Sequence, residues 1–518
     1  AEWLMARGFA TLGVPGMLAA KVTLGVGLLL LMSIAARRQG VRPIAAWICL
    51  LLVAHNLHAF FPMRPQVLSF AAMGALLLVL ERAFTHLGKR RADRRNTRRK
   101  SDPTSVRWRW LLLAPPLFAL WANTHGAFVA GYAIFVAFLV GRAIEAWWRD
   151  GRDATPTVGG LAAIAVASGA ATLLNPYGGR LHGWLLQSLG EPRPEITEWS
   201  SPTPDNPVFW PFVALVTAAV ASVTLTDRRR DPVRIVILLL VGWQAASHLR
   251  HIALFAILGG FWLPPHLQSL ASRLRKHAST NLPTASLTPW TRRGVAAAIA
   301  GAIALQAVFL GQRIAELPVY RSRYPVDAVQ WMADQRVRGD LLVCFNWAQY
   351  AIASLAPDVR VQFDGRFRTC YPQAVIDRHF DFLMGDLGPR NRRADAGPID
   401  GAAVLEVDRP EWVLVDRSYP HAVGVMAEAA GEPQSVWRLV YQDAVAQLWG
   451  RADVVDDPAS DRNVPTARRF VSDHLSLTAA PWPALPRRRD DPFQDRRAPG
   501  EIAKRAINAA GPPAPADG

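Results

Sequence analysis

Apolar segments of membrane-spanning length fill the first 315 residues, and this feature most constrains how the chain can fold. A bilayer core requires roughly 20 apolar residues per helix. About ten such segments can be read: Met17–Ala35, Pro43–Phe60, Gln66–Arg82, Trp110–Ala122, Phe128–Ile144, Gly160–Leu174, Val208–Leu225, Val233–Ala246, His251–Leu263 and Gly294–Gln312. The sequence therefore predicts an α-helical polytopic membrane protein, with a multispanning domain over residues 1–315.

Lysine and arginine gather in alternate loops between these segments. The clearest block, Lys89–Arg109, holds ten Lys or Arg against two Asp. Further basic residues follow the first, fifth, seventh and ninth segments: Arg37, Arg38, Arg42, Arg142, Arg149, Arg152, Arg228, Arg229, Arg230, Arg273, Arg275, Lys276, Arg292 and Arg293. Short loops rich in Lys and Arg stay in the cytoplasm. Every odd-numbered span is therefore expected to end there, which places the start of the chain and everything after Gln312 outside.

The net charge of +17 does not indicate nucleic-acid binding. Most of the excess lies in the loops predicted to be cytoplasmic and in a polar tail, so anionic membrane lipids are the expected partners. No zinc-finger spacing, stacking face or phosphate-cradling glycine loop accompanies the charge. We therefore expect no nucleic-acid partner and a location in a membrane.

The chain begins with Ala1, and residues 1–16 lack the basic start and apolar core of a signal peptide. Since this start is predicted to lie outside, ahead of an inward span, we expect at least one further span and part of an external loop upstream.

Strand and helix patterns alternate from residue 320 to 452, which predicts a small external α/β domain. The expected helices are Pro325–Arg336, Ala348–Leu355 and Gln373–Met384, and the expected strands are Asp340–Asn346, Val359–Asp364, Glu411–Asp416 and the hairpin Trp437–Gln442 with Val445–Trp449. Residues 453–518 are rich in Pro, Arg, Asp and Ala without apolar periodicity, and are expected to be disordered.

Polar residues collect in the turns predicted to be external. They are Arg64, Asn123, His125, Asn175, Tyr177, Glu195, Glu198, His248, Arg250 and His251. Each has a structural alternative, because Arg can anchor a helix at the interface and Asn or His can cap a turn. Together they could hold an anionic group against cationic donors while a carboxylate takes a proton.

As an ordered set, several short motifs resemble bacterial members of the GT-C superfamily, multispanning glycosyltransferases that use polyprenyl-phosphate sugars. The motifs are Glu2-Trp3-Leu4, Arg64-Pro65-Gln66, Trp121-Ala122-Asn123 with His125-Gly126, Asn175-Pro176-Tyr177-Gly178, Glu198-Trp199, Tyr324-Pro325, Asn346-Trp347 and Asp364-Gly365-Arg366. The resemblance covers roughly residues 2–451. The chain departs from the family pattern at Gly126-Ala127 and Ala348-Gln349, where the family usually has paired glycines.

The resemblance implies an inverting transfer of sugar from a polyprenyl-phosphate donor to an envelope acceptor at the outer face of the bacterial inner membrane. It implies catalytic roles for Glu2, Glu198 and His125. Substrate-binding roles fall to Arg64, Asn123, Asn175, Tyr177, His248 and Arg250. The family's catalytic acids lie in the first external loop, of which Glu2 is the acidic residue present here. Some relatives use a divalent metal, but no metal-ligand spacing can be read in this sequence.

Two other classes of function stay open at this stage. The first is a transporter of lipid-linked substrates, although no inverted repeat or matching pair of broken spans is visible. The second is a non-catalytic membrane scaffold whose external domain binds a partner. The motif Asp364-Gly365-Arg366 is predicted to serve the structure of that domain, with Arg366 paired to a carboxylate.

The charge alternation predicts that cysteines introduced at Ser105 and Ser201 will react with an impermeant reagent from opposite sides of an intact inner membrane, Ser201 from outside. The measurement is maleimide labelling of whole cells and inverted vesicles. Labelling of both cysteines from the same side would contradict the predicted topology.

Overall fold

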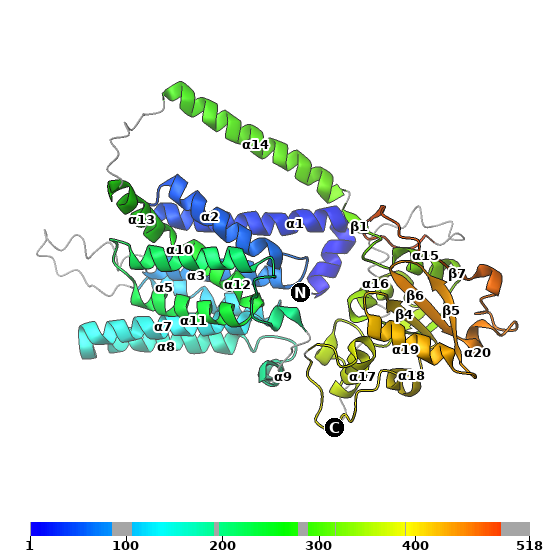
Figure 1. Ribbon diagram of the computed structural model, residues 1–518. Coiled ribbons are helices and arrows are strands. Elements are labelled where there is room, and N and C mark those ends of the chain that lie inside the picture. The colour runs from blue at the N-terminus through cyan, green and yellow to red at the C-terminus, as the bar shows by residue number, and fades with distance from the viewer. Residues whose placement is uncertain are drawn as a thin grey trace, which may run out of the picture. The chain divides into compact units, whose positions relative to one another are not determined.

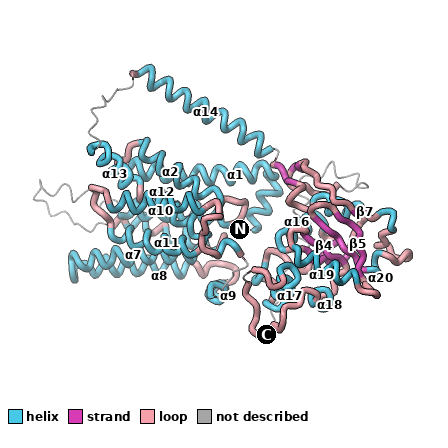
Figure 2. The backbone as a smooth tube through the Cα atoms, viewed as in Figure 1, coloured by secondary structure: helices cyan, strands magenta, loops and turns pink. Residues whose placement is uncertain are grey.

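The computed structural model describes residues 2–84, 106–190, 196–277, 288–315, 317–388 and 390–487. The chain is mostly helical, at 64%, and its C-terminal region contains a small sheet (Figures 1 and 2). Within the described residues, four helical stretches are long and apolar enough to cross a membrane: Trp3–Arg38, Pro43–Phe60, Gln66–Phe84 and Phe128–Ala171. The protein is therefore a helical membrane protein with an added sheet domain.

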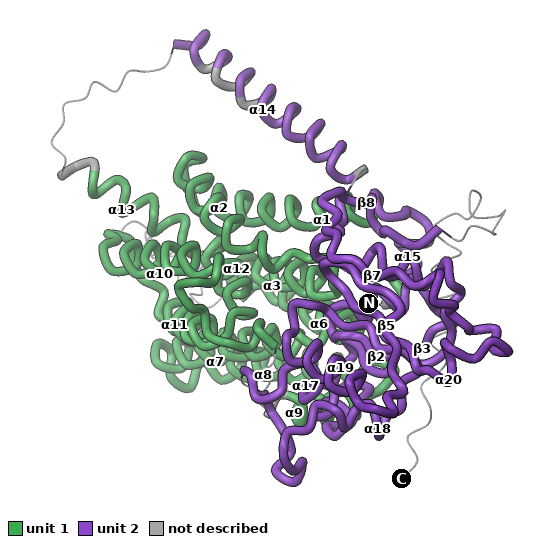
Figure 3. Tube along the Cα trace, turned by 45° about the vertical axis from the view of Figure 1, so that its right-hand side comes forward, with its two compact units in different colours: residues 1–5, 17–287 green, residues 6–16, 288–518 purple. Residues whose placement is uncertain are grey.

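The chain divides into two compact units (Figure 3). Unit 1 comprises residues 1–5 and 17–287, and unit 2 comprises residues 6–16 and 288–518. One boundary lies near residue 287, whereas the sequence analysis placed it near residue 315, because helix α14 (Pro289–Ala315) groups with unit 2.

Each of the ten predicted apolar segments is largely helical. The helices that contain them are α1 (Glu2–Arg38), α2 (Pro43–Leu57), α3 (Gln66–Phe84), α5 (Trp108–Leu111) with α6 (Ala114–Ala122), α7 (Phe128–Asp150), α8 (Thr155–Ala171), α10 (Phe209–Thr224), α11 (Pro232–Ser247), α12 (Ile252–Trp262) and α14. Helix α9 (Gly179–Gly190) and helix α13 (Pro264–His277) also belong to unit 1. Every residue of α12 is buried, so this short helix is surrounded by protein within unit 1.

Local chemistry explains where several of these helices begin and end. Pro43, Pro156 and Pro232 stand in first turns, where the missing N–H of proline costs no helical hydrogen bond. The Asp231 carboxylate accepts hydrogen bonds from the backbone N–H groups of Val233 and Arg234 and so caps α11. The basic block Lys89–Arg109 falls mostly on residues 85–105. This range, which includes Ser105, lies outside the described residues.

Charged side chains buried between helices form a network at one end of unit 1. Arg142 of α7 is 8% exposed and pairs with Asp231 and, at 2.7 Å, with Glu145. Arg234 of α11 pairs with Asp231 at 3.2 Å and with Glu81 of α3 at 3.0 Å. The sequence analysis assigned Arg142 to a basic loop, but it lies within a helix and its charge serves packing between α3, α7 and α11.

Unit 2 is built on a six-stranded sheet. The strand order is β3 (Val359–Val361), β2 (Gly339–Val343), β4 (Trp412–Asp416), β6 (Ala446–Arg451), β5 (Trp437–Gln442) and β7 (Phe470–Val471). Strands β3, β2 and β4 are parallel, whereas β6 is antiparallel to both β4 and β5. Helices α15 (Val326–Asp334), α16 (Phe345–Leu355), α17 (Gln373–Met384), α18 (Ala403–Val407), α19 (Pro420–Gly431) and α20 (Ala452–Val455) accompany it.

The predicted strands and helices of this domain are present, so the α/β pattern is confirmed, but the predicted disorder after residue 452 is wrong for the described part of the tail. Strand β7 pairs in parallel with β5. Strand β8 (Ala479–Pro481) pairs antiparallel with β1 (Pro318–Tyr320). Backbone pairing of this kind needs no apolar periodicity, and strands this short leave no pattern in the sequence. Residues 488–518 lie outside the described residues.

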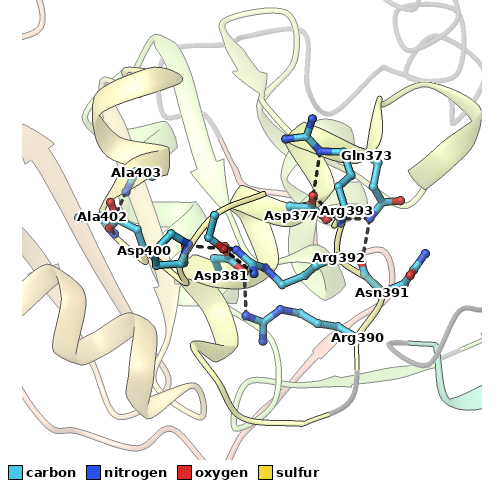
Figure 4. Close-up of polar contacts among 12 residues, drawn as sticks. Gln373, Asp377, Asp381, Arg390, Asn391, Arg392, Arg393, Asp400, Ala402 and Ala403 are labelled. Atoms are coloured by element: carbon cyan, nitrogen blue, oxygen red, sulfur yellow. Dashed lines mark hydrogen bonds and ion pairs between the residues drawn. The ribbon is translucent and has the colours of Figure 1, made fainter. Parts of the chain in front are cut away.

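Three arginines of the segment after α17 pair with carboxylates of that helix (Figure 4). Arg390 and Arg392 each contact Asp381, at 2.7 and 2.8 Å, and Arg393 contacts Asp377 at 3.2 Å. Asp381 and Arg390 are only 6% and 5% exposed. These buried pairs fix an irregular segment that has no ladder of its own, so the cluster has a structural explanation.

Asp381→Asn is expected to destabilise the protein by roughly 3–5 kcal/mol, because two arginines lose their shared buried counter-ion. The matched control is Asp395→Asn, since Asp395 is 78% exposed and contacts Arg393 at 3.7 Å; that exposed pair should contribute less than about 1 kcal/mol. Denaturant unfolding of the full chain in detergent measures both. Equal destabilisation by the two variants would contradict the role of Asp381 as a shared buried counter-ion.

Candidate functional site

Most of the polar residues singled out in the sequence lie at one end of the unit 1 bundle, which we call the Arg64 end. Here α6 and α8 end while α3, α7, α10 and α12 begin. The ionic network of Arg142 and Asp231 lies at the opposite end, where α7 ends and α11 begins. The two ends therefore carry separate polar clusters.

Arg64 occupies the turn that opens α3. Its backbone carbonyl accepts a hydrogen bond from the N–H of Val67, and Pro65 suits the first turn of a helix because it has no N–H to leave unpaired. The guanidinium then leaves the helix end and donates to the carboxylate of Glu198, with Nη1 and Oε1 2.8 Å apart. Both side chains are about half exposed, at 59% and 48%, so solvent can reach the pair.

Glu198 belongs to a short segment, Thr197–Ser201, which we call the strap. It contains a 3₁₀ turn at Thr197–Trp199. The backbone N–H of Leu249 donates to the Ser200 carbonyl over 2.9 Å, and the Ser201 hydroxyl donates to the Ser247 carbonyl over 3.1 Å. The strap is thus held against the turn between α11 and α12.

The second arginine of the site also meets the strap. The Arg250 guanidinium lies over the ring of Trp199, 4.3 Å from its centroid, which is a cation–π contact. The His248 ring meets the same indole edge-on at 6.1 Å. Consecutive strap residues, Glu198 and Trp199, therefore contact the two arginines predicted to bind substrate.

His125 sits at the end of a buried chain of hydrogen bonds. The backbone N–H of Ala127 donates to His125 Nδ1 over 3.3 Å, which makes Nδ1 an acceptor. The Ser69 hydroxyl therefore donates to Nδ1 over 3.0 Å, and the indole N–H of Trp121 donates to Ser69 Oγ over 2.9 Å. This arrangement assigns the ring proton of neutral His125 to Nε2.

Burial, and secondarily the charge of Arg250, lowers the pKa of His125 from 6.5 to about 4. His125 is thus a neutral hydrogen-bond donor near neutral pH. A role for His125 in the candidate site would therefore use the ring as a hydrogen-bond donor rather than as a cation.

Two of the predicted binding residues, Asn123 and Asn175, contact backbone groups of the turns through their side-chain amides. The Asn123 amide donates to the carbonyls of Ala119 and Leu174, at 2.8 and 2.7 Å, and so links the ends of α6 and α8. The Asn175 amide donates to the Thr172 carbonyl, and its oxygen accepts from the N–H of Tyr177. These contacts are those of turn-capping residues, and they leave the Tyr177 side chain 67% exposed.

The other predicted acids are less defined. Glu2 is the first residue of α1, but its side chain lies outside the described part of the chain, as does Glu195. Across the described ranges, no three His, Cys, Asp or Glu side chains gather as the ligands of a metal ion would.

Ser69 is the functional-site residue that the sequence analysis missed. It is 1% exposed and lies one turn into α3, after Arg64-Pro65-Gln66. A hydroxyl within an otherwise apolar span was the available signal, because buried polar groups need partners.

A scan against protein-family models and a search of curated proteins found no match to this chain. The site is therefore interpreted from its own geometry.

His125→Gln is expected to remove an acid-dependent loss of stability. The folded pKa lies below the unfolded value of about 6.5, so the unfolded state binds the proton first as pH falls. Stability is therefore fully present above pH 6.5 and falls by up to about 3 kcal/mol toward pH 4. Thermal unfolding in detergent across this range measures the difference between wild type and variant.

The exposed His474→Gln variant is the control for this experiment, and its stability should follow that of wild type across the range. Parallel curves for wild type and His125→Gln would show that His125 is not held neutral by the fold.

Proposed function

We propose that this protein is an inverting membrane glycosyltransferase that takes a sugar from a polyprenyl-phosphate carrier. The observation that carries the proposal is the convergence, at the Arg64 end, of two arginines, a neutral histidine donor and a carboxylate. Phosphate binding calls for charge-assisted donors, and transfer to a hydroxyl calls for a base.

The proposal includes the orientation derived from the loop charges. The ten apolar segments would cross the bacterial inner membrane, with the Arg64 end and unit 2 outside. In support, several exposed basic residues of unit 1, including Arg152 and Arg229, follow helix ends opposite to Arg64, as the positive-inside rule predicts. Helix α12 is short for a span, but its complete burial removes the need to match the lipid thickness.

In the proposed reaction, an acceptor hydroxyl oxygen attacks the anomeric carbon of the donor sugar. A new carbon–oxygen bond forms there as the bond to the phosphate oxygen breaks on the opposite face, which inverts the configuration. The hydroxyl proton passes to a carboxylate, for which Glu198 and Glu2 are the candidates. Arg64 and Arg250 stabilise the negative charge of the departing polyprenyl phosphate.

His125 would contribute its Nε2–H as a donor to an oxygen of the sugar or the phosphate. The chain from Trp121 through Ser69 fixes the ring orientation, so little ordering is required when the substrate binds. A neutral donor suits this position, because a third positive charge beside Arg250 would be repelled.

The alternative of a non-catalytic scaffold predicts that the same residues only anchor helix ends. Asn123 and Asn175, with their backbone contacts, fit that description. The Arg64–Glu198 pair and the Arg250–Trp199 contact join residues far apart in the sequence, and they are the groups on which the enzyme hypothesis depends.

Arg250→Ala is expected to weaken use of the polyprenyl-phosphate sugar about ten- to a hundredfold, because a phosphate loses a charge-assisted partner contributing roughly 1.5–3 kcal/mol. His125→Gln should instead lower the turnover number more than the donor affinity, and Glu198→Gln should lower the turnover number without weakening donor binding, if they act in the transition state. The measurement is transfer from radiolabelled polyprenyl-phosphate sugars to an envelope acceptor fraction by purified protein.

The matched control is Arg180→Ala, because Arg180 is an exposed arginine in α9 at the same end of the bundle. Melting temperatures are recorded beside the rates. Variants that melt earlier but transfer at the wild-type rate per folded molecule would support the scaffold and contradict the proposal.

A further inference from the structure

Both arginines of the proposed site are already occupied by the protein itself. Glu198 places a carboxylate oxygen 2.8 Å from Nη1 of Arg64, and Trp199 places an aromatic face 4.3 Å from the Arg250 guanidinium carbon. The two contacts come from neighbouring strap residues, so a single short segment covers both cations.

The chemistry of the Arg64 contact is that of an anionic ligand. A carboxylate and a phosphate monoester offer an arginine the same kind of partner, an anionic oxygen in hydrogen-bond range. An incoming phosphate must therefore displace Glu198 to reach the same face of Arg64. The strap is anchored through Ser200 and Ser201, so Glu198 remains close by after it is displaced.

We infer that Glu198 is an internal substitute for the ligand anion, and that the strap holds the site in a self-occupied state which a phosphate group must open. This inference rests on the proposed function, since it concerns regulation of the same site. Trp199 does not compete in this way, because it contacts the face of the Arg250 guanidinium with an aromatic ring and offers no anionic oxygen.

The exposure of the pair sets the size of the effect. With both side chains about half exposed, solvent screens the attraction, and pairs of this kind contribute at most about 1 kcal/mol. Removing the competing carboxylate should therefore tighten phosphate binding roughly two- to fivefold. An ion pair of this strength can be displaced by a ligand, and it keeps Arg64 paired when no ligand is bound.

The test compares binding of a short-chain polyprenyl monophosphate, and separately of inorganic phosphate, to full-length wild type and Glu198→Gln in the same detergent. Glutamine keeps the size of the side chain and removes only its charge. The variant should bind two- to fivefold tighter. A gain for both ligands identifies the phosphate as the competing group, whereas a gain for the polyprenyl compound alone assigns the competition to the lipid-linked form.

Asp205→Asn is the matched control, because Asp205 is an exposed acid in the same loop whose removal changes the net charge equally. It should leave affinity unchanged. The double variant Arg64→Gln with Glu198→Gln should lose the gain, since the arginine for which the two anions compete is gone. Melting temperatures confirm that each variant is folded.

Affinity of Glu198→Gln equal to or weaker than wild type would overturn the inference, as would an equal gain in Asp205→Asn. If wild type binds the phosphates but Glu198→Gln shows no gain, the inference fails and the proposed function stands. If neither wild type nor any variant binds either phosphate compound, the inference and the proposed function fail together. Binding by Glu198→Gln where wild type binds too weakly to measure supports the inference.

Discussion

The pairing of buried charges between α3, α7 and α11 is the constraint on which the helix bundle depends. Arg142, Asp231, Arg234 and Glu81 come from three helices and are largely withdrawn from solvent. An unpaired charge in such a position costs several kcal/mol, so only one relative arrangement of the three helices satisfies all four groups. Apolar packing alone tolerates sliding and rotation, whereas separating these pairs would leave buried charges without partners.

A fixed arrangement at one end of a bundle fixes the turns at the other end, because helices are stiff over this length. Arg64 opens α3, His125 precedes α7 and Arg250 follows α11, so each candidate site residue belongs to a helix that the ionic network positions or to its immediate neighbour. The capping contacts of Asn123 and Asn175 then hold the turns between α6, α8 and α9. Charge pairing and turn chemistry together preorganise the site.

Sequence patterns predicted helices and strands well where an apolar repeat continues over many residues. They predicted less where a contact depends on the fold. Helix α17 was predicted with its observed bounds, and the β5–β6 hairpin was predicted too, with Asp443–Val445 joining its strands. Strands β7 and β8 were missed, because strands this short follow their partners rather than a pattern of their own. Helix α19 was missed as well. The contacts of Ser69 with His125 and of Asp231 with Arg142 could not be predicted, because each joins residues more than 50 positions apart.

Under the proposed function, cations gathered at a membrane face would raise a physical problem that the strap addresses. Without a ligand, Arg64 and Arg250 would attract any lipid headgroup phosphate within a Debye length. An internal carboxylate reduces that attraction, and an aromatic face covers the second guanidinium without adding charge. Because the Arg64–Glu198 pair is half exposed, its contribution is small enough for a well-oriented phosphate with a second partner at Arg250 to exceed it. Under the proposed function, a headgroup that reaches only Arg64 would gain little over the resting pair, and discrimination would arise from requiring both arginines at once.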